Sequence, residues 1–290
     1  MSPWITAARP KTLSAGVIPV VVASALALHD SKFIFFVFTS ALLGATAIQI
    51  ATNYINDASD FLRGADTEER LGPPRMAQSG VLSVRALFTG AAVFFLFAIL
   101  FGIHLIFVAG TPLLFIGVFS IISAIAYTAG PYPLAYYGFG DLFVLIFFGF
   151  ISVCGTYYAH TLSLGLEPFF CALMVGLFGV SLIIVNNARD IPTDIKANKK
   201  TLAVRLGLAT TKNYYSTVVV LPYLILLLFY FLFSWSPLIL TPLVSLPMAV
   251  KNIYRMRQAR GSDQYNSLLG DSAKLQVLFG ILLSSALILA

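Results

Sequence analysis

The sequence predicts an all-α, multi-pass membrane protein that forms a single domain over residues 1–290. Two features of the composition support this fold class: 59% of the 290 residues are hydrophobic, and only 10% are charged. A soluble domain carries about 25% charged residues, so this chain has too few of them to cover a water-exposed surface. The apolar residues also form continuous runs, whereas membrane β-strands alternate apolar and polar residues.

Nine apolar segments are long enough, or nearly so, to cross about 30 Å of hydrocarbon as helices. They lie at 12–28, 33–55, 86–108, 111–129, 140–159, 167–187, 214–233, 236–250 and 272–289. The segment at 236–250 is the least secure, because it is short and contains Pro237, Pro242 and Pro247. Residues 1–11 lack the pattern of a cleaved signal peptide, so the first segment is expected to remain as a span.

The connections between these segments alternate in length. Those at 29–32, 109–110, 160–166 and 234–235 are short, and those at 56–85, 130–139, 188–213 and 251–271 are mostly long and polar. When the N-terminus and the long loops share one side, every basic residue except Lys32 falls on that side. The positive-inside rule then places the N-terminus in the cytoplasm and the C-terminus outside. The net charge of +6 follows from this topology and requires no nucleic-acid partner.

Acidic residues gather on the same side, which the orientation rule does not require. At the end of the second segment, Asn53, Asp57 and Asp60 are spaced i, i+4 and i+7, so a helix places them on one face. Asn56 and Asp60 form a second pair four residues apart, and Asp66 follows. Because like charges at this spacing repel and a helix C-terminus is partially negative, a bound cation would stabilise this end.

A second copy of this pattern ends the sixth segment. Asn186 and Asn187 precede Asp190 by four and three residues, and Asp194 follows it by four. Both helices run inward, so we expect the two acidic ends to face each other across one cavity. Pro192 is a candidate helix break between the two aspartates. A solvated acidic loop would explain one such cluster, but its repetition favours a binding site.

Carboxylate and amide oxygens without His or Cys suit a hard cation such as Mg²⁺, which commonly bridges carboxylates to substrate phosphates. Basic residues of the same loops can balance the remaining phosphate charge. Most of these are expected only to anchor the inner face, with Lys199 and Arg75 as the exceptions. An apolar tunnel capped by metal and diphosphate indicates a lipid diphosphate substrate, whose allylic carbon becomes cationic and must be kept from water.

The acidic motifs "NDASD" with the later Asp66, and "NNARDIPTD", resemble those of the UbiA superfamily of intramembrane aromatic prenyltransferases. Four further stretches are similar in order and spacing to the branch that prenylates 1,4-dihydroxy-2-naphthoate in menaquinone synthesis. They are "RPKTL" (Arg9–Leu13), "RGADTEERLGPPRMAQSG" (Arg63–Gly80), "YTAGPYPLAYYGFGD" (Tyr127–Asp141) and "KTLAVRLG" (Lys200–Gly207). The resemblance covers nearly the whole chain.

The resemblance implies nine helices around a central cavity that opens to the cytoplasm, in a bacterial inner membrane. It also implies two Mg²⁺ ions on a polyprenyl diphosphate. The implied metal ligands are Asn53 or Asn56, Asp57, Asp60, Asn187, Asp190 and Asp194. Asp66 would be a further ligand, although many members carry this acid two positions earlier, where this chain has Gly64.

The resemblance assigns further side chains to the substrates. The implied substrate-binding residues are Arg63, Arg75, Gln78, Asp141, Lys199 and Arg205. Lys199 and the four motif aspartates Asp57, Asp60, Asp190 and Asp194 are implied as catalytic residues, together with Tyr127, which either positions the acceptor or packs against the pocket. Arg9 and Lys11 either face an acidic acceptor or anchor the first helix, and we favour anchoring.

The function implied is Mg²⁺-dependent transfer of a polyprenyl group to 1,4-dihydroxy-2-naphthoate, with decarboxylation. The same chemistry on another acceptor, such as 4-hydroxybenzoate, is an alternative that the residues do not separate. A membrane cation transporter is an alternative of another class, but it would place acids at mid-span, whereas here nearly all lie at inner helix ends. A lipid phosphotransferase would show a Gly-Ala-Arg pattern between the acids, and this pattern is absent.

Overall fold

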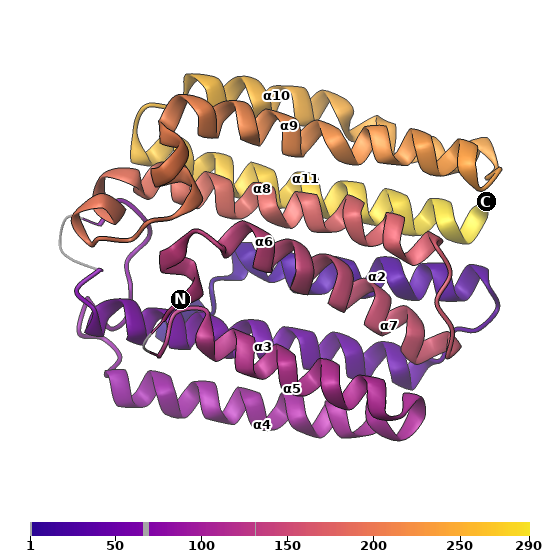
Figure 1. Cartoon of the computed structure of the whole chain (residues 1–290), viewed down its shortest axis with the longest axis horizontal. Helices are drawn as coiled ribbons and strands as arrows, with labels where there is room; N and C mark the ends of the chain where they lie inside the picture. The colour runs from indigo at the N-terminus through magenta and orange to yellow at the C-terminus, as the bar shows by residue number, and fades with distance from the viewer. Residues whose placement is uncertain (1, 66–69, 131) are drawn as a thin grey trace.

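The structure, a computed structural model, describes residues 2–65, 70–130 and 132–290. The described residues form helices and no strands, which confirms the all-α class. The helices lie side by side along the long axis of the molecule (Figure 1). Asp66, an expected metal ligand, lies outside the described residues.

Most of the described chain belongs to long helices. The long α-helices are α2 (Pro10–His29), α3 (Phe35–Leu62), α4 (Val84–Ala109), α5 (Thr111–Ala126), α8 (Glu167–Lys196), α9 (Leu202–Leu232) and α11 (Ser262–Leu289). The shorter elements are α1 (Pro3–Ala8), η1 (Leu134–Tyr137), α6 (Gly140–Val144), the π-helical η2 (Leu145–Ile151), α7 (Ser152–Thr161), η3 (Pro237–Ser245) and α10 (Leu246–Gln258).

Seven helical runs in the described part of the chain are long and apolar enough to cross a membrane. One of them, residues 140–161, joins α6, η2 and α7 without a break. α5 is apolar but shorter, and residues 237–258 are divided between η3 and α10. The division falls where the prolines lie: Pro237 begins η3, Pro242 lies inside it, and Pro247 lies in the first turn of α10, where a missing N–H breaks no helical bond.

Two of the polar segments expected to be loops, 188–213 and 251–271, are largely helical, and 56–85 begins with the last turns of a helix, so these predicted boundaries were wrong. α3 continues to Leu62, and α8 continues through Pro192 to Lys196. The expected break at Pro192 is absent, because α8 continues through this proline to Lys196 although the Ala188 carbonyl loses its backbone donor. Both acidic motifs therefore lie on the last turns of continuous helices.

The long connections gather at one end of the bundle, which we call the loop end (Figure 1). The segments between α3 and α4, between α5 and α6, and between α8 and α9 all lie there, whereas the C-terminus lies at the opposite end. α3 and α8 both run toward the loop end, as the alternating pattern predicts. The ends of these two helices bring the acidic motifs to the same region.

Close packing of α8 against η2 forms one wall of the bundle interior. A Cβ added at Gly176 would lie 2.9 Å from the Cα of Gly149, and one added at Gly149 would lie 2.8 Å from the Ala172 carbonyl oxygen. Only glycine allows the two backbones to approach this closely, as is common where membrane helices cross. This contact fixes the position of α8 relative to the 140–161 segment.

Candidate active site

The first acidic motif holds the loop that follows it. Asp57 is buried on α3, and its two carboxylate oxygens accept hydrogen bonds from the backbone N–H groups of Met76 and Ala77, each at 3.0 Å. These bonds fix the start of the turn at 76–80, which includes the expected substrate-binding residue Gln78. Asp57 therefore positions the loop, while each oxygen keeps a second lone pair for another partner.

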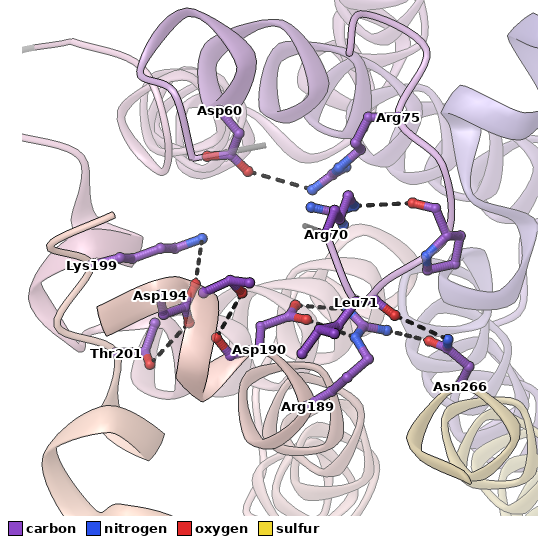
Figure 2. Close-up of polar contacts among 12 residues, drawn as sticks. Asp60, Arg70, Leu71, Arg75, Arg189, Asp190, Asp194, Lys199, Thr201 and Asn266 are labelled. Atoms are coloured by element: carbon purple, nitrogen blue, oxygen red, sulfur yellow. Dashed lines mark hydrogen bonds and ion pairs between the residues drawn. The ribbon is translucent and has the colours of Figure 1, made fainter. Parts of the chain in front are cut away.

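Asp60, one turn further along α3, faces two side chains from other segments. It lies 3.4 Å from the Arg75 guanidinium, and it accepts a hydrogen bond of 2.9 Å from the Tyr136 hydroxyl. Asp60 and Arg75 are both buried. Arg75, which the sequence analysis places near a diphosphate, thus lies directly beside the first motif (Figure 2).

Tyr136 links the two motifs, and the sequence analysis did not identify it. Lys199 Nζ lies 5.0 Å from the centre of its ring, and the Arg63 guanidinium carbon lies 5.5 Å from it. Arg63 also donates a hydrogen bond to the Gly130 carbonyl. Tyr136 belongs to the quoted stretch from 127 to 141, but the sequence alone does not show which of the 13 tyrosines contacts the acidic motifs.

The second motif carries its own basic partners. Arg189 forms two hydrogen bonds of 2.7 Å with the two carboxylate oxygens of Asp190. Asp194 accepts a hydrogen bond of 3.4 Å from the Thr201 hydroxyl, and it lies 4.0 Å from Lys199 Nζ. Figure 2 shows Asp60 and Arg75 on one side of this region, with Asp190, Asp194 and Lys199 opposite.

The asparagines of the motifs lie nearer to the bundle interior. Asn53 donates a hydrogen bond of 2.8 Å to the Ala8 carbonyl, and the Asn56 side-chain oxygen accepts one from the Thr128 hydroxyl. Both line an interior cavity, and so does Asn186 of α8. The expected ligand Asn187 is not among the lining residues, whereas Asn186, its neighbour in the sequence, is.

This cavity has a volume of about 470 Å³ and runs along the bundle. It is lined by α2, α3, α4, α5, α8 and the 140–161 segment. Its polar lining at the loop end includes Arg9, Asn53 and Asn56. Leu105, Ile106 and Leu113 line it near the opposite end, where α4 ends and α5 begins. The cavity is therefore an apolar tunnel with a polar mouth beside the acidic motifs.

Arg9 lines the cavity, which favours its alternative role of facing an acidic acceptor over anchoring the first helix. A positive φ of 53° at Arg9 turns the chain between α1 and α2. Lys11 is exposed, which is consistent with anchoring. Arg9 is thus placed to meet a negatively charged group inside the cavity.

Tyr127 also lines the cavity mouth. A Cβ added at Gly140 would lie 3.0 Å from its hydroxyl, so glycine makes room for the phenol. An ordinary phenol hydroxyl has a pKa of about 10. The hydroxyl therefore stays protonated and can donate a hydrogen bond, but it does not serve as a base at neutral pH.

Two other expected substrate-binding residues lie away from the cavity lining. Asp141 is buried at the start of α6, and its Oδ2 has no hydrogen-bond partner among the residues that the structure describes. Arg205 donates to the carbonyl oxygens of Tyr137 at 2.9 Å and Lys200 at 3.2 Å. Arg205 thus joins the 134–137 turn to the connection between α8 and α9.

The donor set fits Mg²⁺ held jointly with a phosphate ligand. Within the described ranges, no three His, Cys, Asp or Glu side chains form a group that could hold a metal ion alone. The oxygens instead form two carboxylate pairs, one on each motif, with amide oxygens beside them. Mg²⁺ rarely occupies an all-protein cage and usually keeps waters or phosphate oxygens, so paired carboxylates on opposite sides suit it.

Known proteins share both the sequence pattern and the fold. The sequence model of the UbiA prenyltransferase family matches residues 16–278. The chain is 33% identical to the 1,4-dihydroxy-2-naphthoate octaprenyltransferase of Mycobacterium tuberculosis, covering 98% of this chain and 96% of that protein. It is 35% identical to the enzyme of the same name from Escherichia coli K12, covering 83% and 82% of the two chains.

A solved structure of a UbiA homologue from Archaeoglobus fulgidus, bound to GPP and Mg²⁺, superposes with a TM-score of 0.69. The identity is 13% and both chains are covered completely, so this likeness concerns the fold. The family match extends over most of the chain, and the two bacterial relatives exceed 30% identity. The chain therefore belongs to the UbiA prenyltransferase family.

Proposed function

We propose that this protein transfers a polyprenyl group from its diphosphate to 1,4-dihydroxy-2-naphthoate in menaquinone biosynthesis. The observation that carries the proposal is the pair of acidic helix ends at the polar mouth of an apolar tunnel. The names of the bacterial relatives support the naphthoate as the acceptor. A cation transporter is disfavoured because the motif acids lie on the last turns of their helices.

The two motifs would hold the diphosphate from opposite sides. The metal ligands would be the carboxylates of Asp57 and Asp60 on α3 and of Asp190 and Asp194 on α8. The amide oxygens of Asn53, Asn56 and Asn187 would complete the set. Two Mg²⁺ ions, when bound, neutralise the leaving diphosphate. Arg75 lies beside Asp60 and Lys199 beside Asp194, so both can balance further phosphate charge. Arg63 lies on the Tyr136 ring near them, and Gln78 is carried by the same loop as Arg75.

The cavity would receive the prenyl chain and exclude water from the reacting carbon. Its lining away from the mouth is mostly apolar, with a few polar members such as Ser152 and Thr156, so the first isoprene units would be buried in the tunnel while the diphosphate stays at the motifs. When the allylic C–O bond breaks, its electron pair leaves with the diphosphate. The cationic carbon is then sheltered from water, which would otherwise consume it.

Arg9 and Tyr127 are placed to orient the acceptor. Both line the mouth of the cavity, so Arg9 can bind an acidic group while the protonated Tyr127 hydroxyl donates a hydrogen bond. The ring carbon that bears the carboxylate forms the new C–C bond. Carbon dioxide then leaves with its bond electrons returning to the ring, and the naphthoate hydroxyls remain in place.

The membrane topology that accompanies this function has nine spans, with the motifs facing the cytoplasm of a bacterial cell. Among the residues that the structure describes, seven helical runs meet the length of a span, and α5 and residues 237–258 would supply the other two. The basic residues gathered on the loops support this orientation.

A direct assay tests the function. Purified protein is incubated with Mg²⁺, a prenyl diphosphate and a panel of aromatic acids, and the products are identified by mass spectrometry. We expect prenylation of 1,4-dihydroxy-2-naphthoate with loss of carbon dioxide. Preferential prenylation of 4-hydroxybenzoate would replace the acceptor, and the absence of any prenylated product would contradict the proposal.

A further inference from the structure

A buried arginine holds the Asp190 carboxylate in one orientation. The Arg189 side chain is 3% exposed, and its Nε and Nη2 each donate a hydrogen bond of 2.7 Å to a different oxygen of Asp190. Such a planar, two-pronged contact fixes both the position and the plane of a carboxylate. Asp190 has four lone-pair directions, so the contact leaves room for a metal on its other side.

Arg189 is itself held by a residue far away in the sequence. Its Nη1 donates a hydrogen bond of 2.6 Å to Asn266 Oδ1, near the start of α11. Asn266 Nδ2 donates in turn to the Leu71 carbonyl at 3.3 Å. Figure 2 shows this chain of contacts from Leu71 through Asn266 and Arg189 to Asp190. Asn266 thus uses both ends of its amide to join α8, α11 and the loop after α3.

The loop packs directly on the guanidinium. A Cβ added at Gly72 would lie 2.8 Å from Arg189 Nη2 and 3.0 Å from its Cζ. The same Cβ would lie 2.9 Å from Arg70 Nη2, so no side chain fits at position 72 without displacing Arg189, Arg70 or the loop. The same loop reaches the first motif a few residues later, through Arg75 and the Met76 N–H. It therefore spans the gap between the two motifs.

We propose that Asn266 is a positioning residue for the metal site of the second motif. It fixes Arg189, and Arg189 fixes the ligand Asp190. This inference rests on the proposed function, since it assigns Asp190 to metal binding. Partners behind a ligand commonly change metal affinity by about ten- to a hundredfold when they are removed. A purely structural role would change the stability of the fold and leave metal affinity intact.

The test measures metal binding without turnover. Mn²⁺ binding to purified protein is followed by electron paramagnetic resonance in the presence of inorganic diphosphate. We expect Asn266→Leu, which has a similar volume and no hydrogen-bonding groups, to weaken Mn²⁺ binding about tenfold or more. The matched control is Ser267→Ala, because Ser267 is the exposed neighbour on α11 and accepts from Arg255 instead. The control should bind Mn²⁺ as the wild type does.

Gly72→Ala provides an independent second variant, because the change lies in a loop outside the helix bundle. Its added methyl presses on Arg189 at 2.8 Å and should weaken Mn²⁺ binding in the same direction, with the melting temperature nearly unchanged. If both variants fold and their Mn²⁺ affinity lies within about threefold of the wild type, the positioning role is overturned. Such a change in affinity is smaller than the roughly ten- to hundredfold change expected on losing a partner of a metal ligand. Wild-type protein that binds no Mn²⁺ at all would instead contradict the proposed metal site.

Discussion

Replacing Tyr136 by phenylalanine removes one hydroxyl and preserves the ring that Lys199 and Arg63 face. The lost hydroxyl donates a hydrogen bond of 2.9 Å to Asp60, whose side chain is 6% exposed. Hydrogen bonds to charged groups contribute about 1.5–3 kcal/mol. Arg75 remains 3.4 Å from Asp60, so the carboxylate should turn toward Arg75 and away from the diphosphate site.

If the whole of this energy serves to hold Asp60 toward the diphosphate in the transition state, its loss lowers kcat/KM for the prenyl diphosphate by about ten- to a hundredfold. Activity is measured with purified protein at saturating acceptor. Tyr137→Phe is the matched control. Tyr137 is 43% exposed, and its contact with Arg205 is made by the backbone carbonyl, which the substitution leaves in place. The control should retain wild-type activity.

A further variant separates the hydroxyl from the ring. Tyr136→Leu also removes the face that lies 5.0 Å from Lys199 Nζ, so it should lower kcat/KM below that of Tyr136→Phe. A cation over an aromatic face contributes about 0.5–2 kcal/mol. Wild-type kcat/KM in Tyr136→Phe would show that Tyr136 does not orient Asp60 for the reaction, and the reasoning would then be refuted.

Three further predictions concern the metal, the motifs and the packing. Excess chelator should abolish turnover, and Mg²⁺ or Mn²⁺ should restore it; full activity in chelator would exclude the metal role. Asp57→Ala and Asp190→Ala should each abolish turnover while the protein stays folded in detergent, whereas near-normal turnover in either would exclude the paired site. Gly280→Ala places a Cβ 2.3 Å from Ile18 Cγ2, so the free energy of unfolding should fall by about 1–3 kcal/mol in thermal unfolding, with the Mg²⁺ requirement of the enzyme unchanged. An unchanged melting temperature would contradict this packing argument.

The sequence predicts the helical class and the repeated acidic motifs because both depend on local patterns. Continuous apolar runs identify membrane helices, and the spacing of Asp57 and Asp60 places them on one helical face. The boundaries are less predictable, since α3 and α8 extend beyond their apolar stretches as polar helices. Hydropathy cannot locate the end of a helix that continues as a polar stretch, and here much of that polar stretch is buried.

Arg75 and Lys199 were predicted at the site and lie beside Asp60 and Asp194, but two other contacts could not be predicted because they come from distant segments. Tyr136 and Asn266 reach Asp60 and Arg189 through tertiary packing, and neither lies at a helical spacing from its partner. For Arg9, the sequence left two roles open, facing an acidic acceptor or anchoring the first helix, and its place in the cavity lining favours the first. A basic residue at the start of a membrane helix usually anchors it, but the turn at Arg9 directs the chain so that this residue lines the cavity.

The central claim is that both acidic motifs hold one metal–diphosphate group at the mouth of the cavity. Its most direct test is anomalous diffraction from crystals grown with Mn²⁺ and geranyl diphosphate. We expect Mn²⁺ peaks within coordination distance of Asp60 and of Asp190 or Asp194, with the diphosphate between them and the geranyl chain in the tunnel. Mn²⁺ bound at one motif alone, or a diphosphate bound away from the cavity mouth, would contradict the claim.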